Sequence, residues 1–293
     1  MTWFVLATCS AILSAAAAIA EKKALFRVRA LEFSFFVALI TAVIFAALPF
    51  SIDVSAVSRP ALAMLVVKSL MSGSAFLLVM VSLQNNPISD ALPLLGLTPA
   101  ATALLALIAT GESLLVSEWC GVVLMVAGAY LVEVRPRQRF WEPLRDAFAL
   151  KRHAFIFGAV GLFAASSVMD RILVSAQRVD PLVVLFYQQI VYCIVFGALL
   201  VVRRASVRDL LRSGRAQMPL LLTVAILTIA YRYVQLEATK DAPAALVLAV
   251  ERTSVFYASL IGGRLFSEER LKMRLLGAGL IVGSGFLILR VVT

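Results

Sequence analysis

The sequence predicts an all-α integral membrane protein with ten transmembrane helices in two inverted five-helix repeats. The 293 residues are 62% hydrophobic and only 15% charged, a balance that soluble domains do not have. Apolar runs of about 20 residues recur along the chain, and they are continuous rather than alternating, which favours helices over a barrel. The second half of the chain also repeats much of the pattern of the first, and an internal repeat constrains the whole fold.

The repeat is clearest between residues 85–132 and residues 241–289. The first twenty residues share in it and have no basic residue before their apolar run, so we expect a mature helix there rather than a signal peptide. A shift of 156 aligns Pro87 with Pro243, Glu112 with Glu268 and Gly121 with Gly277. A shift of 149 aligns Ala15, Ala16, Glu21 and Lys22 with Ala164, Ala165, Asp170 and Arg171.

Five spans are expected in each half. The predicted domains are a first repeat at residues 1–134, a basic linker at 135–153 and a second repeat at 154–293. Because five is odd, consecutive repeats enter the membrane in opposite senses, as in many transporters. The first five spans are predicted near residues 3–26, 31–50, 61–83, 87–109 and 115–134, and the second five near 154–177, 181–202, 217–238, 242–263 and 271–291.

Basic residues gather in the loops that follow the first, fifth, seventh and ninth spans. The positive-inside rule places these loops in the cytoplasm of an inner (plasma) membrane, with both termini periplasmic or extracellular. The net charge of +10 is then explained by these loops, and no nucleic-acid partner is expected. Residues 135–153 and 203–216 are interpreted either as surface segments on anionic lipid headgroups or as orientation signals alone.

Motifs of enzymes and of metal sites are missing from the sequence. There is no phosphate-binding glycine loop, HExxH or GxSxG, so we expect no enzyme activity. Cys9, Cys120 and Cys193 are scattered, and the single histidine, His153, lies in a basic loop. These positions predict neither a disulfide framework nor a metal site, and no cofactor is expected.

Charged residues near the middle of a span are the first candidates for a binding site, because each costs roughly 2.5–3.5 kcal/mol on insertion scales. Lys68, Arg232, Glu251 and Arg252 lie at such positions. If they face one cavity, its surplus is positive and suits an anionic group. The alternative is an internal ion pair between Glu251 and Arg232.

Polar residues at helical spacing extend this candidate substrate site. Gln235 shares a face with Arg232, and Ser72 shares one with Lys68. Gln188 and Tyr192 belong to the seventh span and can contact a substrate through hydrogen bonds. The alternative is that these residues bridge helices.

A second group of charged residues lies nearer the span ends and is predicted to act in gating or proton coupling. Its members are Glu21, Lys22, Asp170, Arg171 and Asp90. The first four are paired by the repeat, and the alternative for them is a set of ion pairs whose chains reach toward the membrane surface. Asp90 begins a span that contains Pro93 and Pro99, which break helices at transporter binding regions; the alternative is a helix N-terminal charge.

Short motifs recur at matching places in the two halves. They are Gly111-Glu112-Ser113-Leu114 with Gly121 and Gly128, Glu268-Glu269-Arg270-Leu271 with Gly277, Gly279, Gly283 and Gly285, and Glu251-Arg252-Thr253-Ser254 leading into Phe256. These motifs resemble the EamA-like branch of the drug/metabolite transporter superfamily. The resemblance implies a secondary transporter that works by alternating access through a central cavity between the repeats. The glycines of the motifs permit close helix approach, which suits either a homodimer or the sealing of each half.

Taken together, these patterns predict a secondary active transporter of a small polar metabolite that is anionic or amphipathic. Two alternatives stay open. One is a flippase-like translocase of an anionic lipid or a lipid-linked phosphate, and the other is a broad-specificity exporter of drugs and metabolites. The expected partners are the substrate and the anionic headgroups on the cytoplasmic face.

Overall fold

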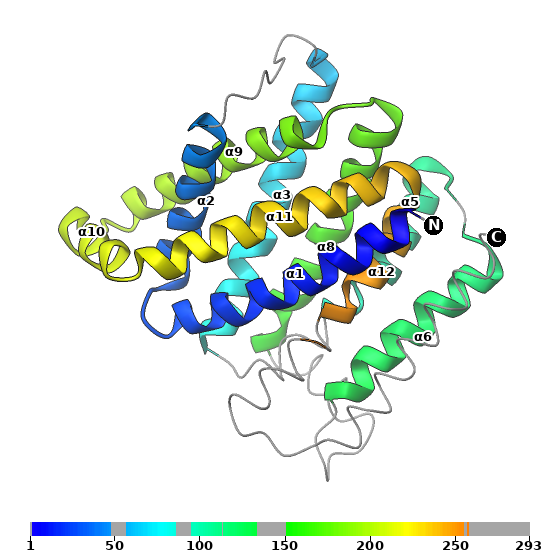
Figure 1. The fold of residues 1–293 in the computed structure, drawn as a ribbon, viewed down its shortest axis with the longest axis horizontal. Helices are drawn as coiled ribbons and strands as arrows, with labels where there is room; N and C mark the ends of the chain where they lie inside the picture. The colour runs from blue at the N-terminus through cyan, green and yellow to red at the C-terminus, as the bar shows by residue number, and fades with distance from the viewer. Residues whose placement is uncertain are drawn as a thin grey trace.

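The computed structural model describes residues 2–47, 57–85, 95–112, 114–133, 151–254 and 257. Over these ranges the chain consists of helices joined by short connections (Figure 1). The predicted tenth span, most of the linker at 135–153 and Asp90 lie outside the described residues. The same holds for the glycines from Gly277 onward, so the packing role predicted for them stays a prediction.

The helices of the first half follow the predicted apolar runs closely. Trp3, Ala7 and Ala11 bury one face of the first helix, and the turn at residues 26–29 connects it to the second. These helices are α1 (Thr2–Leu25), α2 (Ala30–Ala47), α3 (Arg59–Asn85), α5 (Thr98–Thr110) and α6 (Val116–Glu133).

Helix α5 begins later than the predicted span at 87–109. A turn at Gly96 and Leu97 precedes it, and Pro99 occupies its first turn, where the missing N–H of proline does not interrupt a helical hydrogen bond. The helix ends at Gly111, whose φ of 68° is left-handed, a conformation that glycine adopts without strain. In the described part of this span α5 therefore begins after the turn at residues 96–97, and the break expected from Pro93 and Pro99 stays a prediction.

One helix of the second half has the same bounds as its predicted span, residues 181–202. Asp180 accepts a hydrogen bond from the Leu182 N–H and Pro181 follows it, so α9 begins at the proline. The helix before it begins at residue 151, so it includes the last three residues of the predicted linker, and it continues into a π-helical turn. These elements are α8 (Lys151–Arg171), the π-helix η2 (Ile172–Ala176), α9 (Pro181–Val202), α10 (Val207–Ala216), α11 (Met218–Asp241) and α12 (Ala244–Glu251).

Among the residues that the structure describes, six helices are long and apolar enough to cross a membrane, and α5 and α6 are shorter apolar helices. Large apolar side chains also lie on the outer surface, among them Val5, Ile12, Ile108 and Val123. Such a surface is stable against lipid and not against water. The chain is therefore an all-helical multi-pass membrane protein, while the full count of ten spans stays a prediction.

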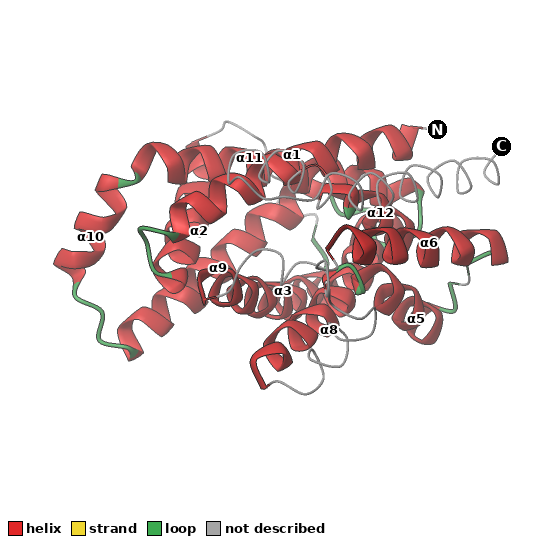
Figure 2. Cartoon of the chain, turned by 90° about the horizontal axis from the view of Figure 1, so that it is seen from below, coloured by secondary structure: helices red, strands yellow, loops and turns green. Residues whose placement is uncertain are grey.

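The two halves pack against each other in a reciprocal pattern. Long helices of one half lie beside long helices of the other, as α1 does along α11 in Figures 1 and 2. The most extensive of these contacts between described helices have counterparts in which the halves are exchanged, so the repeat is present in the packing as well as in the sequence. The paired contacts are α1 on α11 with α3 on α8, α1 on α12 with α5 on α8, and α2 on α11 with α3 on α9, while α2 on α9 corresponds to itself.

The basic segment predicted at 203–216 contains the amphipathic helix α10. Ser206 caps its N-terminus by accepting from the Asp209 N–H. Its glycine, Gly214, is buried against α2, where a Cβ atom would lie 2.4 Å from Phe36 Cζ. A close approach of this kind fixes the position of α10 across the end of α2.

We therefore expect Gly214→Ala to lower the melting temperature of the detergent-purified protein. The Phe36 ring is buried, so relieving the overlap displaces packed groups at a cost of roughly 1–3 kcal/mol. Gly161→Ala in α8 is the matched control, because a Cβ there meets nothing within 4 Å. An equal melting temperature for the two variants would contradict the packing described here.

Candidate functional site

A cavity of about 170 Å³ lies between the two halves. Its walls come from α1, α2 and α3 of the first half and from α8, α9, α11 and α12 of the second. Its lining includes most of the polar residues that the sequence analysis selected. An engineered cavity of similar size, about 150 Å³, holds one benzene molecule in another protein, so this volume accommodates a small organic ligand.

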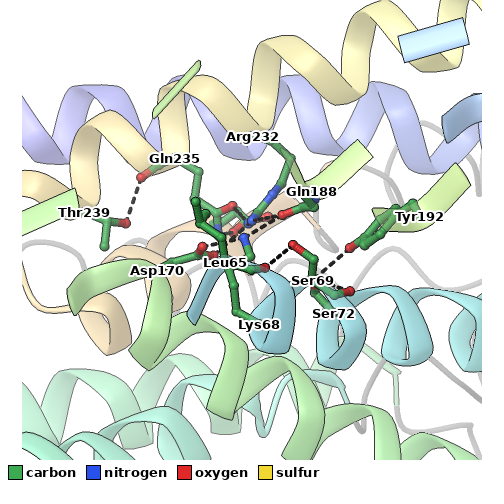
Figure 3. Close-up of polar contacts among 11 residues, drawn as sticks. Leu65, Lys68, Ser69, Ser72, Asp170, Gln188, Tyr192, Arg232, Gln235 and Thr239 are labelled. Atoms are coloured by element: carbon green, nitrogen blue, oxygen red, sulfur yellow. Dashed lines mark hydrogen bonds and ion pairs between the residues drawn. The ribbon is translucent and has the colours of Figure 1, made fainter. Parts of the chain in front are cut away.

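The carboxylate of Asp170 in α8 is the centre of the polar network (Figure 3). One of its oxygens lies 2.5 Å from Lys68 Nζ of α3, and the other lies 3.0 Å from Arg232 Nη2 of α11. All three residues are at least four-fifths buried as side chains. The carboxylate thus joins two cations from helices that belong to different repeats.

Two glutamines extend this network toward neighbouring helices. Gln188 of α9 accepts from Lys68 Nζ at 2.6 Å and from Arg232 Nη2 at 3.5 Å. Gln235 accepts from Arg232 Nη1 and donates through its Nε2 to a carboxylate oxygen of Glu251 in α12. Both are nearly fully buried, so these bonds satisfy polar groups that would otherwise be costly.

Tyr192 of α9 forms another part of the wall. Its hydroxyl donates to Ser72 Oγ at 2.8 Å, and its ring stacks on Phe76 with centroids 6.4 Å apart. A Cβ atom at Gly73 would lie 2.9 Å from Tyr192 Cε1. Glycine at position 73 therefore lets the tyrosine ring approach α3 closely.

Two charged groups of the cavity wall have no hydrogen-bonding partner within the described part of the chain. Arg252 follows α12, and its Nε is buried without a hydrogen bond. Glu21 of α1 is 7% exposed, lines the cavity and takes part in neither a hydrogen bond nor an ion pair there. Both charged groups are therefore available to a ligand, as is the unpartnered hydroxyl of Thr228 in the same lining.

The cations that follow Glu21 and Asp170 in the chain each bind the end of a helix. Lys22 donates to the Leu83 carbonyl of α3 at 2.6 Å. Its repeat counterpart, Arg171, donates to the carbonyls of Thr239 and Lys240 at the end of α11 at 2.6 and 2.8 Å, and it forms a 3.3 Å ion pair with Glu112. Cations at the carboxyl end of a helix satisfy free carbonyls and interact favourably with its dipole.

We call the contacts of Lys22 with Leu83 and of Arg171 with Thr239 the struts. They follow the repeat closely, because Leu83 and Thr239 are themselves 156 positions apart. The cavity wall obeys it in position but not in chemistry. The polar residues of the second half correspond to apolar residues of the first, so one end of the cavity is polar and the other apolar. The pairs are Arg232 with Phe76, Gln235 with Val79 and Glu251 with Leu95, whereas Asp170 corresponds to another acidic residue, Glu21.

The sequence separated the charges into a midspan group and a group near the span ends, whereas the structure brings members of both groups together. Asp170, assigned to the second group, lies among Lys68, Arg232 and Gln188 because α8 packs against α3 and α11. The alternative ion pair of Glu251 with Arg232 is also absent, since Gln235 lies between them. Lys68 is fully buried behind Asp170 and does not line the cavity.

Several lining residues were not selected from the sequence. Ser166 and Ser167 precede Asp170 and correspond to Ala17 and Ala18 in the repeat, and all four line the cavity. The alignment of the two halves is therefore the sequence signal that could have identified them. Phe163 and Tyr231 also line the cavity. Their aromatic rings occur in long apolar helices, where no pattern distinguishes a cavity wall from a helix contact.

The charges of the cavity balance, but they are unevenly placed. The lining contributes the carboxylates of Glu21, Asp170 and Glu251 and the guanidinium groups of Arg232 and Arg252, and Lys68 adds a third cation behind them. Around Asp170 the described residues carry a surplus of one positive charge. The remaining negative charge, Glu21, lies apart from this network.

The helices and the buried polar cavity define a multi-pass membrane protein of the small-molecule transporter class. The EamA-like transporter family model matches residues 1–134 and 150–290, and the chain belongs to this family. A solved crystal structure with 14% sequence identity has a TM-score of 0.71 and covers 98% of this chain and 96% of its own; this likeness shows the fold alone. No curated protein matches the chain significantly.

The two repeat-related carboxyls make a direct test of the network. We expect Asp170→Asn to lower stability by about 3–5 kcal/mol, because it leaves two buried cations without their shared carboxylate. Glu21→Gln removes a carboxyl that has no such partner in the described structure, so we expect its stability to be unchanged or raised. Melting temperatures of the purified variants distinguish these outcomes, and similar losses in both would contradict the network as described.

Proposed function

We propose that the protein is a secondary transporter that moves a small organic anion by alternating access through the cavity between its repeats. The observation that carries this proposal is Arg252, a cavity cation whose Nε is buried without a hydrogen bond. A buried guanidinium nitrogen without a partner costs free energy that a bound carboxylate or phosphate recovers.

The surroundings of Arg252 strengthen this assignment. Glu251 precedes it in the chain, but its carboxylate accepts from Gln235, and none of the described carboxylates lies within ion-pairing distance of Arg252. The neighbouring network pairs two cations, Lys68 and Arg232, with two carboxylates, Asp170 and Glu251, so Arg252 is the surplus positive charge at this end. Since charges in a low-dielectric cavity act strongly, this end of the cavity favours an anionic group.

The apolar end of the same cavity suits the carbon skeleton of the ligand. Phe76, Val79, Met80 and Leu95 line it, and burial of apolar surface contributes roughly 25 cal/mol per Å². An acidic head with a small apolar body matches both ends. This pattern favours an amphipathic metabolite, and the small volume supports a soluble molecule over a whole lipid.

Alternating access is supported by the reciprocal packing of the halves. In an inverted repeat, exchanging the arrangements of the two halves converts a cavity that opens on one side into one that opens on the other. The struts of Lys22 and Arg171 are exchanged by the same operation. We infer that the inverted insertion of the halves, with the termini on the outer side of the membrane, provides these two states.

Ligand-dependent stability tests the anion site. The purified protein is heated with a panel of soluble carboxylates and phosphate esters, and separately with phosphatidylglycerol. A ligand at 100 times its dissociation constant stabilises the protein by about 2.7 kcal/mol, and we expect a soluble anion to raise the melting temperature. Arg252→Gln should abolish this shift, because it removes the guanidinium that the anion contacts.

The control is Arg208→Gln, the same change on the exposed surface of α10, which should leave the shift intact. A shift with phosphatidylglycerol alone, lost in Arg252→Gln, would replace the proposal with lipid translocation. A shift that survives in Arg252→Gln would remove the assignment of the anion to Arg252.

A further inference from the structure

Glu21 is the cavity residue that the proposed anion site does not use. Its side chain belongs to α1, is 7% exposed and lines the cavity. Within the residues that the structure places, it has no hydrogen bond and no ion pair. Burial of a carboxylate without a hydrogen bond or an ion pair costs free energy, and a bound cation offsets that cost.

The repeat shows what is different about Glu21. Its counterpart Asp170 is neutralised by Lys68 and Arg232. The positions that correspond to these two cations hold Val224 and Phe76, whose side chains supply neither charge nor hydrogen bonds. The first half therefore keeps the carboxyl of the network but lacks the cations that satisfy it.

Helix contacts place Glu21 toward the apolar end of the cavity. The next residue, Lys22, binds the Leu83 carbonyl, so its ammonium is directed to the end of α3. Along α3 the cavity lining runs from Ser72 to Leu83, about 16 Å of helix. Glu21 thus lies near the Leu83 end, away from the level at which Ser72 meets Tyr192.

A second hydrogen-bond acceptor lies at a similar level. Ser34 is one helical turn into α2, just as Glu21 is one turn before the end of α1, and both line the cavity. The Ser34 hydroxyl donates its proton to the Ala30 carbonyl at 2.8 Å, so its oxygen faces a ligand only as an acceptor. A carboxylate and a hydroxyl oxygen together suit a group with several N–H donors.

We propose that Glu21 and Ser34 form a subsite for a protonated amine. The ligand of the cavity is then dipolar, with an ammonium group at Glu21, an apolar skeleton along Val79 and Met80, and an acidic group at Arg252. The dipolar ligand depends on the proposed function for its acidic end, whereas the amine subsite stands on Glu21 alone. This division follows the unequal charge of the two ends of the cavity.

Three five-carbon probes separate the two ends. Pentylamine carries only the ammonium, pentanoate only the carboxylate, and 5-aminopentanoate both. Dissociation constants are measured by calorimetry on the intact protein in detergent. We expect Glu21→Gln to weaken pentylamine and 5-aminopentanoate by about 10- to 100-fold, as for loss of a hydrogen bond to a charged group, and to leave pentanoate unchanged.

The matched control is Glu237→Gln, because Glu237 pairs with Lys240 outside the cavity lining. Pentylamine that fails to bind the native protein, or that binds Glu21→Gln as tightly, would overturn the proposal. If Glu21→Gln does not fold, Glu21→Asp replaces it, because the shortened side chain draws the carboxylate away from the ammonium. A pentylamine affinity of this variant equal to that of the native protein would equally overturn the proposal.

The same measurements identify a failure of the proposed function separately. If pentylamine binds through Glu21 but pentanoate does not bind the native protein, the amine subsite stands and the anion site at Arg252 is wrong. If pentanoate binds through Arg252 and pentylamine does not bind, the anion site stands and the amine subsite is wrong.

Discussion

The buried ion pairs of Asp170 with Lys68 and Arg232 are the constraint on which the arrangement of the helices depends. A lone charge within a membrane protein is expensive, so each of these residues requires the others. Lys68 comes from the first repeat, and Asp170 and Arg232 come from the second. The network therefore holds the halves together at one end of the cavity, where any ligand must approach them.

The cavity shows how two repeats with one backbone pattern acquire different chemistry. Exchange of the halves preserves the positions of the helices and of the struts, but it replaces Arg232 by Phe76 and Gln235 by Val79. Polar groups gather at the end where they satisfy one another, and apolar groups remain at the other end. The cavity therefore has one polar end and one apolar end, although the helices around it are arranged nearly symmetrically.

Much of the fold was predictable because hydrophobic runs, prolines and caps act locally. Asp180 and Pro181 specify the start of α9 without reference to any other helix. The contacts of the site depend on which helices meet and on how each is rotated. Spacing along α3 cannot show that Lys68 lies behind Asp170, and the position of Asp170 near a span end gave no sign that α8 brings it to Arg232.

The struts have a mechanical consequence, because Lys22 follows Glu21 and Arg171 follows Asp170. Adjacent residues of a helix point about 100° apart, so a small rotation of α1 that moves the carboxylate toward a ligand also moves the lysine relative to the end of α3. Occupancy of the cavity and closure of its ends then share one degree of freedom in each half. Coupling of this kind needs no separate signalling path, since a single rigid helix carries both contacts.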